Sequence, residues 1–169
     1  MADEKKVALV TGSNRGIGLE TARQLGQQGV RVIVSARTER EAANAAGKLR
    51  SEGVEAEALA LDVTKATDRA FAAKFIESRY GKLDILVNNA GVGPTDGLIG
   101  LRASASTESE LHSIFNINLF SLVVLTHELL PLLRKSEGGR IVNLASILWL
   151  SDASINGAKP DRADAEIRL

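Results

Sequence analysis

Short apolar runs alternate along the chain with longer segments in which apolar residues recur at helical spacing. Each run is rich in valine, isoleucine or leucine and nearly continuous, as expected for a strand covered on both faces. Five strands are predicted, over residues 7–11, 31–35, 58–61, 84–87 and 140–144. Strands that alternate with helices in this way favour a parallel sheet built from βαβ units.

Two of the intervening helices have recognisable starts. Thr38 is followed three residues later by Glu41, and Thr107 is followed in the same way by Glu110. This is the capping-box pattern, in which a hydroxyl and a carboxylate satisfy the first free amides of a helix. Both lie where a crossover helix should begin.

The longest predicted helix runs from Glu108 to about Leu133, with glycines at 138 and 139 as a stop signal. Pro131 lies near its end and is expected to bend the helix or end it early, because proline cannot donate the helical hydrogen bond. No repeat or linker divides the chain, so residues 1–147 are expected to form one α/β domain. Residues 148–169 are more polar and turn-like and are expected to be an irregular tail.

Composition narrows the choice of function. A chain of 169 residues with 44% hydrophobic content suits one domain. Its 21 basic and 21 acidic residues cancel, which argues against nucleic acid as a partner. Without cysteine there is no disulfide or thiolate site, and no metal cluster stands out. No apolar run approaches the roughly 20 residues that span a bilayer, so we expect a cytoplasmic protein without a membrane partner.

A glycine-rich segment joins the first strand to the helix after it. It comprises Thr11, Gly12, Ser13, Asn14, Arg15, Gly16, Ile17 and Gly18. Glycine lets backbone amides approach a pyrophosphate closely, and a following helix aims its N-terminus at the same anion. This context predicts a dinucleotide site rather than a plain tight turn.

The charge at the end of the second strand bears on the choice of nucleotide. NAD-binding proteins usually place a carboxylate there, to accept hydrogen bonds from the ribose 2′-hydroxyl. Here the strand ends in Ser35, Ala36 and Arg37, and the first acidic residue after it is Glu39. Arg37 and Arg15 could pair with a 2′-phosphate, which predicts NADP (NADPH) in preference to NAD. The alternative is that each arginine simply faces water.

The Thr-Gly-x-x-x-Gly-x-Gly pattern, together with Asn88, Asn89, Ala90 and Gly91 after the fourth strand, resembles the short-chain dehydrogenase/reductase family. The polar stretch from Ser151 to Leu169 resembles an insertion found in the monomeric carbonyl reductases of that family. The resemblance implies a Rossmann-type doubly wound parallel sheet, here incomplete with about five strands. It also implies that Asn89, Ala90 and Gly91 line the cofactor ribose and that Asp62 and Val63 contact the adenine.

Two residues match the family's catalytic set. Asn118 corresponds to the asparagine that helps hold a water in a proton relay, with Asn116 as the competing assignment. Ser146 corresponds to the serine that hydrogen-bonds the substrate carbonyl. His112 and His127 are expected to be solvated or structural rather than catalytic.

The family's proton donor is a tyrosine activated by a lysine four residues later. The only tyrosine, Tyr80, lies before the fourth strand and is followed four residues later by Asp84; the only lysine after Ser146 is Lys159, with Ile155 four residues before it. The dyad is therefore missing, and we expect a truncated chain with turnover near the detection limit.

The leading hypothesis is an NADP-dependent oxidoreductase that, when complete, acts on a small-molecule ketone, aldehyde or alcohol. The alternative is a non-catalytic nucleotide-binding or interaction module, and an epimerase-like protein fits the later motifs less well. Because a sheet that stops at the fifth strand leaves an edge uncovered, we also expect self-association through that edge.

Overall fold

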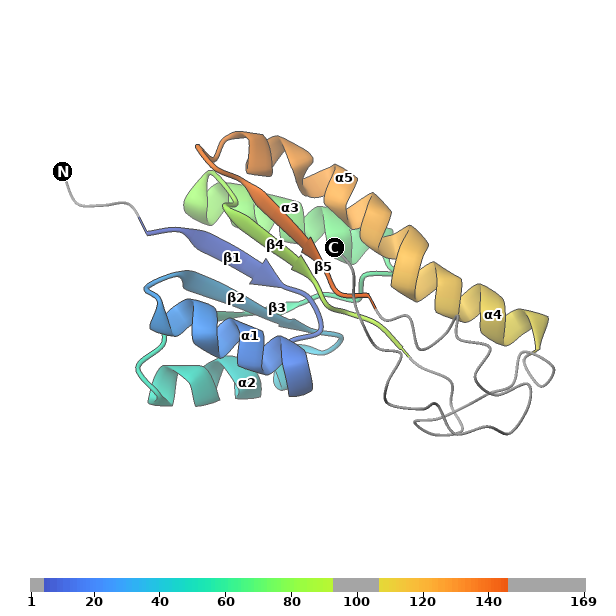
Figure 1. Cartoon of the computed structure of the whole chain (residues 1–169), viewed down its shortest axis with the longest axis horizontal. Helices are drawn as coiled ribbons and strands as arrows, with labels where there is room; N and C mark the ends of the chain where they lie inside the picture. The colour runs from blue at the N-terminus through green and yellow to red at the C-terminus, as the bar shows by residue number, and fades with distance from the viewer. Residues whose placement is uncertain (1–4, 93–106, 146–169) are drawn as a thin grey trace, which may run out of the picture.

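The computed structural model describes residues 5–92 and 107–145. Its five strands are all parallel and form one sheet in the order β3-β2-β1-β4-β5 (Figure 1). They are β1 (Val7–Val10), β2 (Arg31–Ala36), β3 (Ala56–Ala60), β4 (Ile85–Asn88) and β5 (Arg140–Asn143). The chain builds outward from β1 to one edge and then to the other, as in a Rossmann-type doubly wound sheet. The predicted fold class is confirmed.

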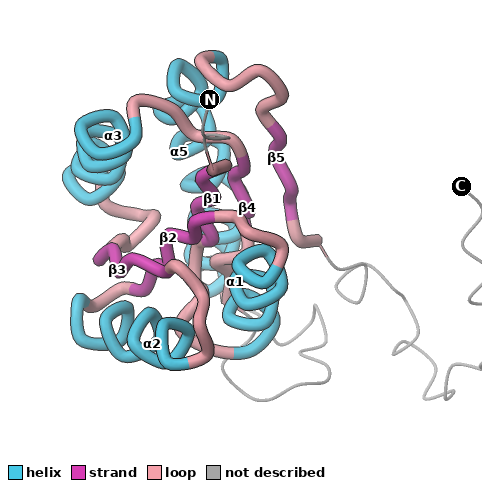
Figure 2. The backbone as a smooth tube through the Cα atoms, turned by 90° about the vertical axis from the view of Figure 1, so that its left-hand side faces the viewer, coloured by secondary structure: helices cyan, strands magenta, loops and turns pink. Residues whose placement is uncertain are grey.

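Helices cover both faces of the sheet. They are α1 (Gly16–Gln27), α2 (Glu39–Ser51), α3 (Ala66–Tyr80), α4 (Glu108–Phe115) and α5 (Ser121–Arg134). Figure 2 shows α1 and α2 on one side of the strands and α3 and α5 on the other. A π-helical turn, Asn116–Phe120, joins α4 to α5 without a break in the helical path.

Alternating side chains of the strands divide the core into two layers. Leu9 and Ile33 face the cluster shared with α3 and α5, and Ala8 and Val10 face the cluster shared with α1 and α2. All four are completely buried. This two-sided burial explains why the strands read as continuous apolar runs rather than as alternating ones.

The start of β3 and the end of the long helix differ from the prediction. The strand begins at Ala56, two residues early, because its alternating residue Glu57 is neutralised by Arg79. Pro131 does not end the helix, which continues to Arg134. Proline removes one hydrogen bond, but the turn after it carries the buried residues Leu132 and Leu133, whose packing holds it in place.

Both predicted helix starts are present. At α4 the capping box is complete: the Thr107 hydroxyl accepts from the Glu110 amide, and the Glu110 carboxylate accepts from the Thr107 amide. At α2 the Thr38 hydroxyl accepts from the Glu41 amide but donates to the Glu41 carboxylate. At α2 the Thr38–Glu41 pair therefore satisfies one backbone amide, that of Glu41, instead of the two that a complete capping box satisfies.

The helical run Glu108–Arg134 is, by length and composition, long and apolar enough to cross a membrane. The expectation that no segment reaches this length was wrong here, because residues 111–127 lack Asp, Glu, Lys and Arg although polar residues interrupt the apolar ones. A single such helix is weak evidence for a membrane span, since a core helix passes the same test. Leu125 and Leu129 of this helix are fully buried against the sheet layer.

Candidate functional site

A cleft of about 830 Å³ opens where four parallel strands end. Its walls are the segments that follow β1, β2, β3 and β4, joined by one residue of the π-helical turn. The lining residues are Gly12, Asn14, Arg15, Gly16, Ile17, Gly18, Ala36, Arg37, Glu41, Leu61, Asp62, Val63, Thr64, Asn89, Ala90, Gly91, Val92 and Ile117. The structure thus brings together every predicted cofactor-binding residue except Ser13.

The glycine-rich segment and the segment after β4 pack directly against each other. Gly12 has a φ of +61°, and a Cβ there would lie 2.9 Å from the Cα of Ala90. A Cβ on Gly18 would overlap the side-chain nitrogen of Asn89 and lie 2.8 Å from the Gly12 carbonyl. Only glycine fits these positions without displacing backbone. The two sequence motifs are therefore one structural unit.

Buried Thr11 connects the two segments by hydrogen bonds. Its hydroxyl oxygen accepts from the backbone amides of Asn89 and Ala90, both at 2.9 Å. The Asn89 side chain donates in return to the carbonyls of Thr11 and Gly12, at 2.8 and 3.0 Å. These four bonds fix the floor of the cleft before any ligand arrives, which lowers the entropic cost of binding.

Ser13 serves the framework instead of the cleft surface. Its hydroxyl donates to the Val10 carbonyl at 2.7 Å and accepts from the Ser35 amide at 2.9 Å, and its own amide donates to the Ser35 carbonyl. The residue is completely buried. Its side chain joins the ends of β1 and β2, and its assignment as a cofactor contact stays a prediction.

The first turn of α1 makes one end of the cleft electropositive. It contains no acidic residue, and Arg15 stands at its N-cap position. The unpaired amides and the helix dipole favour an anion at such an end. Exposed Arg37 adds a second positive charge.

Glu41 is a lining residue that the sequence did not reveal. Its carboxylate accepts a hydrogen bond of 2.8 Å from the Thr38 hydroxyl, and it shares the cleft with Arg37. The capping pattern of Thr38 and Glu41 could have indicated this position. It places Glu41 in the first turn of a helix that begins at the cleft, and a side chain in that turn lies near the cleft.

The segment after β3 presents a carboxylate that is ionised at neutral pH. Asp62 Oδ1 accepts from the amide and the hydroxyl of Thr64, at 3.0 and 2.7 Å. Burial is the largest single influence and acts to raise the pKa of Asp62. The hydrogen bonds from Thr64, with the charges of Lys65 and Arg37, outweigh it and hold this pKa below its usual value.

Asn118 holds the segment after β4 against the long helix. Its side-chain nitrogen donates to the Val92 carbonyl and its side-chain oxygen accepts from the Val92 amide, both at 2.8 Å. The residue lies in the π-helical turn, a distortion often found at functional sites. Asn116, the competing assignment, is exposed. The catalytic role of Asn118 stays a prediction, and it requires that the side chain act while it holds these two hydrogen bonds to Val92.

Ser146 lies outside the described residues. His112 is exposed and pairs with Glu108 of its own helix at 3.6 Å, and His127 is also exposed. Neither histidine lines the cleft.

Tyr80 lies at the end of α3, where the guanidinium of Arg31 covers its ring at 5.4 Å. Burial is the main reason that the pKa of Tyr80 is raised to about 12, with Glu57 acting in the same direction. A proton donor for carbonyl reduction needs the opposite shift. Tyr80 does not line the cleft, and its environment does not suit that role.

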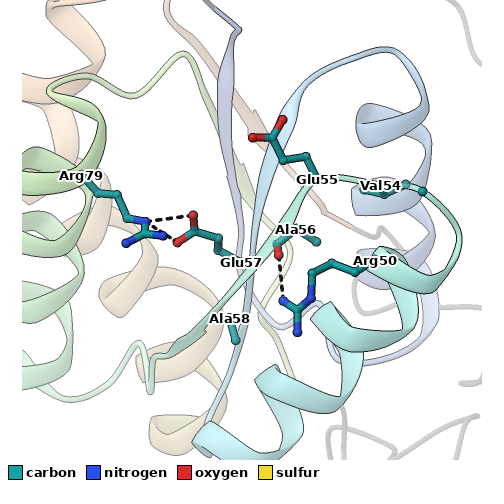
Figure 3. A pocket seen from close by; sticks show the side chains of 8 residues that line it. Arg50, Val54, Glu55, Ala56, Glu57, Ala58 and Arg79 are labelled. Atoms are coloured by element: carbon teal, nitrogen blue, oxygen red, sulfur yellow. Dashed lines mark hydrogen bonds and ion pairs between the residues drawn. The ribbon is translucent and has the colours of Figure 1, made fainter.

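A second hollow, of about 610 Å³, lies along the outer edge of β3 (Figure 3). Arg50 donates to the Ala56 carbonyl at 2.9 Å, and Arg79 forms an ion pair with Glu57 at 2.6 Å. Both arginines thus have partners within the hollow, and none of the predicted site residues lies there.

The family model described as short chain dehydrogenase matches residues 6–154. An uncharacterized oxidoreductase of Bacillus subtilis (strain 168) is 36% identical over 151 residues, which cover 85% of this chain and 54% of that protein. The (+)-neomenthol dehydrogenase of Arabidopsis thaliana is 36% identical over 188 residues, covering 98% of this chain and 62% of its own length. The chain thus spans little more than half the length of these relatives.

Solved structures show the same likeness. An actinorhodin polyketide ketoreductase variant with NADPH has a TM-score of 0.78 and 35% identity, covering 90% of this chain and 57% of its own. A metagenomic short-chain oxidoreductase with NADP has a TM-score of 0.73 and 33% identity, covering 83% and 62%. A 7α-hydroxysteroid dehydrogenase with NADH and a 7-oxo bile acid conjugate has a TM-score of 0.73 and 31% identity, covering 84% and 53%.

Proposed function

The chain belongs to the short-chain dehydrogenase family, and from this we propose that its cleft binds NADP(H) as part of an oxidoreductase of small carbonyl compounds or alcohols. The observation that carries the proposal is the single cleft whose walls combine the glycine-rich segment, Arg37, the Asp62–Val63 segment and the Asn89–Gly91 segment. Its shape and chemistry suit a dinucleotide: an electropositive helix end for the pyrophosphate, with polar walls on both sides.

The preference for NADP rests on Arg37 and Arg15. Both guanidinium groups are exposed and line the cleft, so they are free to pair with a ribose 2′-phosphate. Two of the similar structures are described with NADP or NADPH, which supports this choice, while a third is described with NADH.

Titration of the purified chain with NADPH and NADH, followed by nucleotide fluorescence, tests the proposal. NADPH should bind at least tenfold more tightly. Arg37→Ala should weaken NADPH binding about tenfold and leave NADH unchanged, because a charge-assisted hydrogen bond contributes about 1.5–3 kcal/mol. Arg40→Ala is the matched control, since Arg40 is also exposed but does not line the cleft. Equal or tighter binding of NADH would contradict the assignment to NADP.

Catalysis by the 169 residues alone is a separate matter. They contain no Tyr-x-x-x-Lys, and Tyr80 has its pKa raised rather than lowered. We therefore propose that this chain binds the nucleotide without ordinary turnover, with Ser146 and Asn118 as the catalytic residues of the site. An assay that found normal NADPH-dependent carbonyl reduction by the purified chain would refute this part of the proposal.

The proposed partners are the nucleotide and a small carbonyl or alcohol substrate, in the cytoplasm. We further propose that β5, whose four residues are all exposed, pairs with a second copy of the chain. Sedimentation velocity should show a concentration-dependent dimer that Val142→Lys abolishes, while Val124→Lys on the exposed face of α5 serves as control. A monomer at all concentrations would remove this proposal.

A further inference from the structure

An arginine behind the cleft supports the wall formed by the segment after β3. Arg69, in the first turns of α3, is only 9% exposed. Its Nη1 donates to the Val63 carbonyl at 2.8 Å, a bond that is itself buried. Val63 lines the cleft next to Asp62, so this guanidinium holds the wall from its hidden side.

Further hydrogen bonds order this wall. The Asp62 amide donates to the Asp68 carboxylate at 3.1 Å, and the Lys65 amide donates to the Asp62 carbonyl at 3.0 Å. With the two bonds from Thr64 to Asp62 Oδ1, the segment forms a closed network. Arg69 connects this network to a second helix.

That connection runs to α5. Arg69 Nε pairs with Glu128 Oε1 at 3.3 Å, and Glu128 Oε2 is buried without a hydrogen-bond partner among the described residues. The Arg69 side chain is 11% exposed and that of Glu128 is 30% exposed, so the pair is only partly withdrawn from water, and with one carboxylate oxygen unpartnered within the described part of the chain a large net gain in stability from it is not expected. The Arg69–Glu128 pair is therefore better explained by the position that it gives to the guanidinium of Arg69 than by its contribution to stability.

We propose that Arg69, held by Glu128, is a positioning residue for the nucleotide cleft, which sets the wall that faces the adenosine part of the ligand. The proposal rests on the nucleotide binding proposed above. Arg69 does not line the cleft itself and acts through the Val63 carbonyl. Through Glu128, the position of α5 and the shape of this wall become linked.

The same helix offers a matched comparison. Arg79, also on α3, pairs with Glu57 at 2.6 Å in the hollow shown in Figure 3. That arginine is 57% exposed in its side chain and has no bond to the segment after β3. The two pairs share residue types and helix and differ in burial and in contact with the wall.

The test uses Arg69→Met, Glu128→Gln and, as control, Arg79→Met in the full chain. NADPH and adenosine 2′,5′-bisphosphate are titrated against each. Arg69→Met should weaken the binding of both ligands about three- to tenfold, within the range found for residues that act on a site without touching its ligand. Glu128→Gln, which keeps the arginine, should weaken it about twofold. Arg79→Met should bind like the wild type. Should Arg69→Met fail to fold, Glu128→Gln keeps the arginine and still tests the link.

Hydrogen exchange of the nucleotide-free proteins separates positioning from general destabilisation. Arg69→Met should accelerate exchange at the amides of Thr64 and Lys65 and leave β1 unchanged. Unchanged exchange there, or exchange raised equally in β1, would overturn the inference, as would unaltered affinity of Arg69→Met. If the wild type binds neither probe, the proposed function fails, and the exchange result still decides whether Arg69 orders the wall.

Discussion

The strands β1 and β5 are both four residues long, both parallel to β4, and surrounded very differently. Every residue of β1 is buried, whereas every residue of β5 is exposed. β5 keeps a full register with β4, so backbone pairing alone forms the strand. Within residues 5–92 and 107–145 no element covers it fully: Ile141 and Val142 are 42% and 46% exposed, although a parallel strand is normally covered on both faces.

The same contrast extends to the helices. Leu122, Leu125 and Leu129 of α5 pack into the core, while Phe115, just before the π-helical turn, is 52% exposed and Val123 is 59% exposed. Within the described residues, the side of the sheet that carries the glycine-rich segment is closely packed, whereas apolar side chains near β5 stay exposed to solvent. The cleft is therefore closely packed and hydrogen-bonded even though the neighbouring half of the sheet is not enclosed by the described residues.

The largest expected effect is at the closely packed side. Gly18→Val should abolish detectable NADPH binding, at least a hundredfold loss, because its side chain would displace Asn89 and the Gly12 carbonyl. Gly47→Ala in α2 is the control. The nearest atom to a Cβ there is 3.8 Å away, so stability should rise by up to about 1 kcal/mol with unchanged binding. Tight binding by Gly18→Val would show that the packing of the two motifs is dispensable.

Val10 and Val142 allow the two strands to be compared by one kind of substitution. Val10→Ala should lower the free energy of unfolding by about 2–3 kcal/mol, because Val10 is completely buried and a cavity remains. Val142→Ala should lower it by less than about 0.5 kcal/mol. Urea denaturation measures both. An equal loss at Val142 would mean that β5 is covered in solution, and a dependence on protein concentration would identify a second copy as the cover.

Asp62, in the wall of the cleft, should have a smaller and pH-dependent effect on the stability of the fold. Its folded-state pKa is lowered, so the ionised carboxylate favours folding fully above its unfolded pKa, and the contribution is lost as pH falls through the folded value. The Tm of the wild type should therefore exceed that of Asp62→Asn at pH 6, and the gap should close in acid. A gap that is constant from pH 6 to pH 2.5 would assign the difference to something other than the charge.

Much of this arrangement could be predicted from the sequence. Strand positions, sheet type and the grouping of the predicted cofactor-binding residues follow from local patterns, since each motif lies directly after a strand. The rest depends on contacts between distant segments. Ser13 turns inward because Ser35 lies beside it in space, and Asn118 clamps Val92 across 26 positions of sequence. The π-helical turn and the continuation past Pro131 likewise depend on packing that no local pattern records.

The smallest expected effect concerns Glu41, the acid that shares the cleft with Arg37. Glu41→Gln keeps an oxygen for the Thr38 hydroxyl and removes a negative charge near the proposed 2′-phosphate. NADPH affinity should therefore rise about two- to threefold at low salt, and less at about 0.15 M salt, where exposed charges are screened beyond about 8 Å. Glu39→Gln, exposed in the same turn but outside the cleft, should have no effect. Weaker NADH binding by Glu41→Gln, without a gain for NADPH, would instead indicate that this carboxylate accepts a hydrogen bond from the ribose hydroxyl and that the cleft is shaped for NAD.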